Sequence, residues 1–522
     1  MNGKKMARAA GFMMFATLIA RLLGLLRDMV FYTWFGRTHI TDAYNAAFSI
    51  PDLIYMLLVG GALSSAFIPV FSSYLAREQE EEAWKAASIV LNYTIIAMLV
   101  LIFIGEIYTR PLVLLLVPNL PFEEINLTVL LTRVMFIQTF FMALNGIAMG
   151  VLNSKQHFTW PAIGSILYNV GIITLGLAMA RVWGIMAFSI GVVVGSIINF
   201  LVQVPALLRA GTKYYPSLNY RHPGFKQIIT LMIPVAVGLS VTQINLFITQ
   251  NLASGLAEGS ISALRLAQRV MQLPIGIFGT SIALAVFPTM NFQAARDEMQ
   301  GFKRTFSLGV RAIFLITIPA GVGLIALREP IIQLFFQQGK FTAADTSSTA
   351  WALLFYSLGL FAYSALQLLN RVFYSLKDTL TPVMVGIVSI GLNILFSILL
   401  VGPMQDRGLA LAYSVAGIMN VLILIALLKW RMQSIDGFKM VKSFIISTAA
   451  SGVMYLVVRF LVTGLQTVLP LAGKAQELIV VAGGVGAGVL VYGVIVLLFR
   501  LEESQLVLSM IKSRIPGLNF LG

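Results

Sequence analysis

The chain has 522 residues, of which 58% are hydrophobic and only 11% are charged. Soluble proteins carry roughly 25% charged residues, so this composition excludes a soluble enzyme, a disordered chain and a single-span receptor. A membrane-spanning helix needs about 20 apolar residues, and a transmembrane barrel would instead show alternating segments of about 10 residues. The composition therefore predicts an all-α polytopic membrane protein.

Charge and cysteine content narrow the class further. The net charge is +15, which in a membrane protein indicates basic cytoplasmic loops and an anionic ligand rather than nucleic acid. The chain has no cysteine, which excludes disulfides and cysteine-based sites. The histidines His39, His157 and His222 lie in polar stretches between apolar runs. We expect them to be solvated loop side chains rather than metal ligands.

The apolar runs predict fourteen membrane spans joined by short loops. The first run is too long for a signal peptide and lacks a small-residue cleavage site, so no cleavable leader is expected. The predicted spans cover residues 10–35, 43–74, 87–109, 125–151, 158–180, 184–208, 227–253, 262–290, 305–327, 346–374, 380–402, 408–429, 440–463 and 477–499. With the N-terminus inside, the cytoplasmic segments hold about three times as many Lys and Arg as the outer ones, as the positive-inside rule requires. Both termini are therefore predicted to be cytoplasmic.

Two segment pairs indicate an internal repeat. IPVFSSYLARE at 68–78 parallels FPTMNFQAARD at 287–297, and GVLNSKQHFTWP at 150–161 parallels RVFYSLKDTLTP at 371–382. The two offsets are 219 and 221 residues and each covers six spans. Because six is even, the halves should share one orientation and be related by an axis along the membrane normal, with a substrate site at their interface.

The repeat predicts three parts of the chain. The first six-helix lobe is expected at 1–215 and the second at 216–436, followed by an extra helix pair at 437–522. Polytopic proteins with such repeats transport substrates by rocking one lobe against the other.

Polar side chains recur at helical spacing on the first two spans of each half. These stripes consist of Thr17, Arg21, Gly24 and Asp28, with Arg27 off the line; Asp42, Asn45, Ser49 and Asp52; Ser240, Gln243, Phe247 and Gln250; and Arg265, Gln268, Arg269 and Gln272. Because charged residues inside a bilayer usually face a wet interior, the stripes predict a polar cavity between the lobes. The arginine guanidinium is a permanently charged fork that suits phosphate or carboxylate, so the cavity should take an anionic substrate.

A structural role is the alternative for some of these arginines. Arg21 and Asp28 could form a buried ion pair between helices, whereas Arg133, Arg311 and Arg459 lie towards span ends and are expected to snorkel to the interface. No nucleotide-binding loop, zinc-binding HExxH, paired carboxylates or histidine-based triad is present. We therefore expect no catalytic residue, no metal and no cofactor.

Five segments resemble the MurJ (MviN) family of lipid II flippases, which belongs to the multidrug/oligosaccharidyl-lipid/polysaccharide exporter superfamily. The segments are ARLLGLLRD at 20–28, TDAYNAAFSIPDL at 41–53, GALSSAFIPVFSSY at 61–74, AQRVMQLPIGIFGTSIALAVFP at 267–288 and LKDTLTP at 376–382. The resemblance implies fourteen helices, two six-helix lobes and alternating access in a bacterial inner membrane. It also implies a groove for the lipid tail, formed by the last two helices.

The implied substrate is lipid II, the undecaprenyl-pyrophosphate-linked peptidoglycan precursor, moved from the inner to the outer leaflet. By motif, Arg21, Arg27, Asp42 and Arg269 correspond to family residues in or near the central cavity. We expect Arg21, Arg27 and Arg269 to bind the pyrophosphate, with Asp28 and Asp42 either orienting them or contacting the sugar-peptide head group. Cavity-lining candidates are Asn45, Ser49, Asp52, Gln243, Gln250, Gln268 and Gln272. A monomer with membrane lipids around it and transient contacts with cell-wall synthesis machinery is expected.

The chain departs from the family pattern in two places. Tyr55 and Met56 stand where many relatives carry an arginine pair, and Gly60-Gly61 stands where an acid-Gly pair often follows. Arg265, one turn before Arg269, is the candidate replacement for the missing cation. Spans seven and eleven lack the acids through which some relatives are proposed to bind sodium, so the driving force stays open.

Two further functions are open at this point. The first is a flippase for another lipid-linked oligosaccharide; a drug or cation antiporter would need cavity acids. The second, from another class, is a polytopic glycosyltransferase, which should carry an acidic catalytic residue in a sizeable outer loop. The outer loops are short, which favours the flippase.

Overall fold

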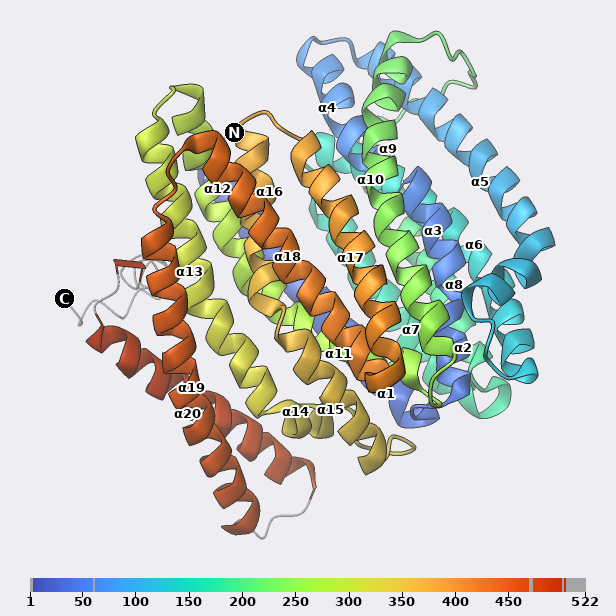
Figure 1. Ribbon diagram of the computed structural model, residues 1–522. Coiled ribbons are helices and arrows are strands. Elements are labelled where there is room, and N and C mark those ends of the chain that lie inside the picture. The colour runs from blue at the N-terminus through green and yellow to red at the C-terminus, as the bar shows by residue number, and fades with distance from the viewer. Residues whose placement is uncertain (1–2, 60–61, 469–472, 500–501, 504–522) are drawn as a thin grey trace. The chain divides into compact units, whose positions relative to one another are not determined.

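The computed structural model describes residues 3–59, 62–468, 473–499 and 502–503, and every regular element in these ranges is helical (Figure 1). The chain divides into two compact units. The first comprises residues 1–262 with 339–341, and the second comprises 263–338 with 342–522. The predicted all-α fold is confirmed, while the lobe boundaries predicted from the repeat stay a prediction.

In the first unit α8 lies against both α6 and α7, α1 packs against α7, and α10 packs against α3, α4 and α5. The helices are α1 (Gly3–Phe35), α2 (His39–Ala47), α3 (Ser49–Leu58), α4 (Ala62–Ala76), α5 (Glu80–Leu116), α6 (Phe122–Ser154), α7 (Thr159–Trp183), α8 (Met186–Leu201), α9 (Val204–Arg209) and α10 (Pro223–Ser254). Glycines make the α7–α8 pairing possible: a Cβ on Gly195 would lie 2.7 Å from the Tyr168 carbonyl oxygen. Small residues at such crossings let membrane helices approach closely.

In the second unit, α13 packs against α12, α16 and α19, and α20 packs against α19 and α14. The helices are α11 (Ser260–Pro274), the π-helix η1 (Ile275–Gly279), α12 (Thr280–Ala295), α13 (Met299–Ala326), α14 (Arg328–Phe336), α15 (Ala343–Ser357), α16 (Leu360–Ser375), α17 (Leu380–Met404), α18 (Asp406–Met432), α19 (Gly437–Val468) and α20 (Lys474–Leu498). The core of this unit is a cluster of aliphatic and aromatic side chains from α12, α13, α16 and α18.

Within the described residues, ten helices are long and apolar enough to cross a membrane, or eleven if one bent pair counts as a single span. That pair is α15 and α16, which meet at 43°. The chain is therefore a multi-pass membrane protein. The predicted number of fourteen spans is consistent with this finding but stays a prediction.

The second predicted span, 43–74, is not one helix, and in this respect the prediction is wrong. The structure breaks it into α2, α3 and α4, with Phe48 between the first two. Pro51, in the first turn of α3, has no N–H to donate to the carbonyl of Ala47, so one helical hydrogen bond is missing across this break. The break between α3 and α4 includes Gly60-Gly61, which lies outside the described residues.

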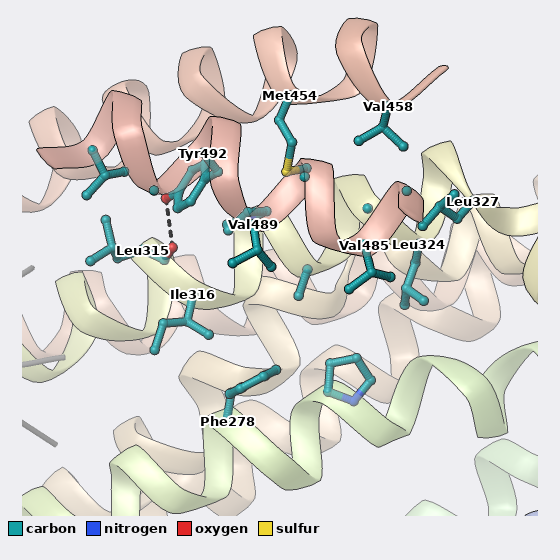
Figure 2. A pocket seen from close by; sticks show the side chains of 18 of the residues that line it. Phe278, Leu315, Ile316, Leu324, Leu327, Met454, Val458, Val485, Val489 and Tyr492 are labelled. Carbon is teal, nitrogen blue, oxygen red and sulfur yellow. Dashed lines mark hydrogen bonds between the residues drawn. The ribbon is translucent and has the colours of Figure 1, made fainter. Parts of the chain in front are cut away.

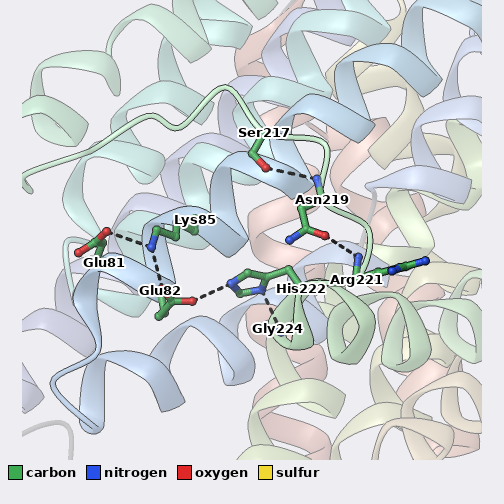
Figure 3. Close-up of polar contacts among 8 residues, drawn as sticks. All are labelled: Glu81, Glu82, Lys85, Ser217, Asn219, Arg221, His222 and Gly224. Atoms are coloured by element: carbon green, nitrogen blue, oxygen red, sulfur yellow. Dashed lines mark hydrogen bonds and ion pairs between the residues drawn. The ribbon is translucent and has the colours of Figure 1, made fainter.

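The segment before α10 is bound to the start of α5 (Figure 3). His222 accepts from the Gly224 N–H through Nδ1 at 3.1 Å, so its Nε2 carries the proton and donates to Glu82 Oε2 at 3.1 Å. Asn92 donates to the Ser217 carbonyl oxygen at 2.9 Å. The predicted solvation of His222 is wrong, because the residue is 7% exposed and these two bonds offset its burial.

Asp378 joins the start of α17 to the end of α18. Its carboxylate accepts from the Thr381 N–H at 3.0 Å, the Thr381 hydroxyl at 2.8 Å and Arg431 Nη1 at 2.7 Å. The Thr381 backbone bond, followed by the other two partners, holds the pKa of Asp378 below its ordinary value of 3.8. The stabilisation from this carboxylate is thus complete above pH 3.8 and is lost as the pH falls through the lower folded-state pKa.

We predict that Asp378→Asn lowers the free energy of unfolding at pH 7 by about 1 kcal/mol, the usual contribution of a helix-capping side chain. Thermal unfolding in detergent at several pH values measures the difference from the wild type, which should shrink below pH 3.8. Arg431→Gln is the matched control, because it removes the ion pair and leaves the cap, and it should cost less. A difference for Asp378→Asn that stays constant with pH contradicts the assigned role of the carboxylate.

Candidate functional site

The charged candidates of α1 form an ion pair between sequence neighbours. Arg27 donates to Asp28 Oδ1 from Nη2 at 2.9 Å and from Nε at 3.1 Å, and its Nη1 lies 3.5 Å from Asn169 Oδ1 in α7. The side chains of Arg27 and Asp28 are 16% and 11% exposed. Arg21 is exposed. Asp28 thus fixes the direction of the Arg27 guanidinium, while its role towards a substrate stays a prediction.

Asp42 and Asn45 bind the first turn of α11. Asp42 Oδ1 accepts from the Ser262 N–H at 2.7 Å, while Asn45 donates to the Ser262 hydroxyl at 3.0 Å and to the Tyr32 hydroxyl at 2.9 Å. Asp42 is 2% exposed. A carboxylate at a helix N-terminus is stabilised by the free N–H groups and the helix dipole. The geometry therefore makes Asp42 a residue that positions α11.

Two other predicted polar residues of the first unit form a hydrogen bond between helices. The Ser49 hydroxyl donates to Gln250 Oε1 at 2.7 Å and so joins α3 to α10. Asp52 and Gln243 are half-buried on the same two helices. The stripes predicted on spans two and seven thus meet at Ser49 and Gln250.

The predicted stripe on α11 is the exposed side of an amphipathic helix. Arg269 and Gln272 are exposed, and Arg265 and Gln268 are half-buried. The remaining side chains form the buried face, namely Leu264, Leu266, Ala267, Val270 and Met271. Gln268 hydrogen bonds to Tyr413 in α18. The second unit therefore presents the two arginines away from its own core.

Helix α11 ends in a π-helical turn that the sequence pattern did not predict. After Pro274 the backbone continues as η1, and α12 follows without a gap. Single π-turns inside helices are rare and often occur at functional sites. The only sequence signal was the proline with Gly276 and Gly279 close behind it.

An apolar cavity of about 550 Å³ lies within the second unit (Figure 2). It is lined by side chains from η1, α13, α14, α19 and α20, among them Phe278, Leu315, Ile316, Leu324, Leu327, Ile331, Met454, Val458, Val485, Val489 and Tyr492. Gly323, Gly484, Gly488 and Gly493 also contribute to the walls. A cavity lined in this way suits a hydrocarbon chain and offers nothing to a charged group.

The structure corrects the expectation for Arg311, which does not snorkel to the interface. The residue is 5% exposed and donates to Glu503 at 2.9 Å and to Glu502 at 3.0 Å. Hydrogen bonding to Arg311 lowers the pKa of Glu502 from its ordinary value. A buried guanidinium needs such partners. They follow α20 in the chain, almost 200 residues away, so no local pattern around Arg311 could indicate them.

Comparison with known proteins places this arrangement in a family. The family model described as lipid II flippase MurJ matches residues 31–473. A probable lipid II flippase MurJ of Bdellovibrio bacteriovorus is 31% identical over 434 residues, covering 82% of each protein. The lipid II flippase MurJ of Burkholderia cenocepacia is 30% identical over 417 residues, covering 78% of this chain and 81% of its own length.

Solved structures agree with the sequence comparison. A lipid II flippase MurJ in an inward closed conformation matches with a TM-score of 0.79 and 28% identity, covering 94% of this chain and 98% of its own. A multidrug resistance MATE family transporter in an inward-facing conformation shares the fold, with a TM-score of 0.69 at 14% identity. Family model, relatives and structure converge on a family of transporters, not enzymes, and this chain belongs to the MurJ lipid II flippase family.

Proposed function

We infer that this chain flips lipid II from the cytoplasmic to the outer leaflet of a bacterial inner membrane. The observation that carries the proposal is the pair of arginines that α11 presents outside the core of its unit, in a chain of this family. A permanently charged side chain in a membrane helix needs a water-filled or anionic environment. The pyrophosphate of lipid II supplies the anion.

The head group is proposed to bind in a cationic central cavity, and the two six-helix lobes are proposed at 1–215 and 216–436. Arg21, Arg27 and Arg269 are the proposed pyrophosphate ligands, since a guanidinium fork binds two phosphate oxygens at once. Asp28 supports this role for Arg27 by holding it through two hydrogen bonds. Asp42 contributes indirectly by capping α11, and the lobes alternate access by rocking.

The lipid chain is proposed to lie along the helix pair at 437–522, in the apolar cavity between α13 and α20. Transfer of a methylene group out of an apolar environment costs about 0.8 kcal/mol, so a long polyprenyl chain stays out of a polar site. The lining of the cavity supports this assignment. We further propose a monomer with cytoplasmic termini and transient contacts with cell-wall synthesis enzymes.

A growth assay tests the function as a whole. A bacterium depleted of its own lipid II flippase should regain growth when this chain is expressed. Failure at normal membrane levels contradicts the proposal, and labelled lipid II in vesicles then separates it from a flippase for another lipid-linked oligosaccharide.

The first prediction of this section concerns the exposed arginine of α11. Arg269→Ala should abolish rescue while leaving membrane insertion intact, because it removes charge and no packed side chain. Hydrogen bonds to charged groups contribute about 1.5–3 kcal/mol, so pyrophosphate binding should weaken roughly ten- to a hundredfold. Arg269→Lys should be impaired as well, since a point charge lacks the fork. Full rescue by the Ala variant would remove Arg269 from the site.

A second prediction tests whether Arg265 replaces the cation that is missing from α3. Arg265→Ala should reduce flipping, and adding Tyr55→Arg to that variant should restore part of it. Initial flipping rates of labelled lipid II in vesicles measure both effects. Arg265→Lys is the control, because it keeps a positive charge at the same position, and it should flip faster than Arg265→Ala. A silent Arg265→Ala would mean that Arg265 is only structural.

A third prediction concerns the apolar cavity, which larger side chains at its glycine positions should fill. A Cβ on Gly323 or Gly493 would have no atom within 4 Å, and both residues line the cavity. Gly323→Leu and Gly493→Leu should therefore fold normally but compete with the lipid chain and slow flipping. Gly486→Leu, on α20 and equally unobstructed but outside the lining, is the matched control. Wild-type rates in both cavity variants would exclude the cavity as the chain site.

A further inference from the structure

Tyr492 satisfies a backbone carbonyl that a proline has left without its helical partner. In α13, Pro319 has no N–H to donate to the Leu315 carbonyl four residues earlier. The Tyr492 hydroxyl of α20 donates to that oxygen at 2.7 Å (Figure 2). An unsatisfied carbonyl in an apolar membrane interior costs several kcal/mol. The bond is therefore a strong and directional link between α20 and α13.

This link lies within the apolar cavity, and all three residues belong to the cavity lining. Nearer the start of α20 the helix is held close to Leu327, because a Cβ on Gly484 would lie 2.7 Å from Leu327 Cδ2. The eight helical steps from Gly484 to Tyr492 span about 12 Å at the usual rise of about 1.5 Å per residue. Between these two points α20 forms a wall of the cavity.

Further contacts fix α20 beyond both ends of this wall. Lys474 donates to the Gln333 carbonyl at 2.6 Å and to the Gln337 carbonyl at 3.1 Å, at the end of α14. After α20, the bond from Arg311 to Glu503 is made one turn before Leu315 on α13. Of these attachments, only the one made by Tyr492 is a polar side-chain contact inside the cavity.

We propose that Tyr492 is a positioning residue that sets the separation of α20 from α13 and thereby makes the cavity selective for a long, continuous hydrocarbon chain. This proposal rests on the assignment of the cavity to the lipid chain. Tyr492 acts through the wall that it holds, since its hydroxyl is engaged with Leu315. Loss of the hydroxyl leaves the ring in place and lets the wall move.

The test compares two pyrophosphate lipids that share a head group and differ in the chain, undecaprenyl pyrophosphate and farnesyl pyrophosphate. The measured quantity is the ratio of their dissociation constants for the purified full chain in detergent. The wild type should prefer the longer chain. Tyr492→Phe should reduce that preference about tenfold, as expected for one hydrogen bond of about 1.4 kcal/mol, with unchanged competition by inorganic pyrophosphate. Tyr455→Phe, on α19 outside the lining, should keep the wild-type ratio.

A second variant distinguishes two roles of Tyr492, namely holding α20 against α13 and giving the Leu315 carbonyl a hydrogen-bond partner. Pro319→Ala supplies an N–H that can bond to the Leu315 carbonyl within α13. In this background, Tyr492→Phe should cost less thermal stability, yet the chain preference should remain low because α20 is still released. Recovery of the wild-type ratio in the double variant would overturn the proposal, since Tyr492 would then only satisfy the carbonyl.

The remaining outcomes are also decisive. An unchanged ratio in Tyr492→Phe overturns the positioning role while leaving the chain site intact. Equal binding of both lipids by the wild type overturns the chain site and this role with it. Failure of inorganic pyrophosphate to compete with either lipid would count against the proposed head-group site instead.

Discussion

A backbone inside a bilayer has no water with which to form hydrogen bonds, so each N–H and C=O must find a partner within the protein. Helices meet this requirement through their own backbone bonds, whereas a proline leaves the carbonyl four residues earlier without its N–H partner. Pro51 lies in the first turn of α3, just after the break from α2, and Pro274 precedes the π-turn η1. Pro319 frees the Leu315 carbonyl, which Tyr492 satisfies from another helix. At Pro319 the missing helical bond is thus replaced by a bond that joins two helices distant in the sequence.

The same lack of water governs the charges. Arg27 is held by Asp28 and Asn169, and Arg311 is held by Glu502 and Glu503. Both arginines are largely buried within their units. The stripe on α11 differs, since Arg269 is exposed beside a buried apolar face. Exposure thus distinguishes Arg269 from Arg311, whereas the half-buried Arg27 is held by Asp28 and is also a proposed pyrophosphate ligand.

The two ends of the proposed substrate make opposite physical demands. A pyrophosphate needs fixed positive charge, whereas a polyprenyl chain needs a surface without polar groups. The second unit holds both kinds of surface, with the arginines on α11 and the apolar cavity bounded in part by Phe278 of the next element, η1. The proposed sites for the chain and the head group therefore lie partly on consecutive segments of the sequence.

The sequence by itself determined the helical membrane class, the polar face of α11 and the family, because hydropathy, helical periodicity and local motifs are properties of neighbouring residues. It predicted Asp28 and Asp42 as site residues, but not that Asp42 caps α11 through Ser262. Only the tertiary structure decided the break in span two, the burial of His222 against Glu82, the partners of Arg311 and the bond from Tyr492 to Leu315. The contacts of His222, Arg311 and Tyr492 each join residues more than a hundred positions apart in the sequence. A pattern that repeats every 3.6 residues shows which face of a helix is polar or apolar, but the helix that covers this face depends on how the whole chain packs.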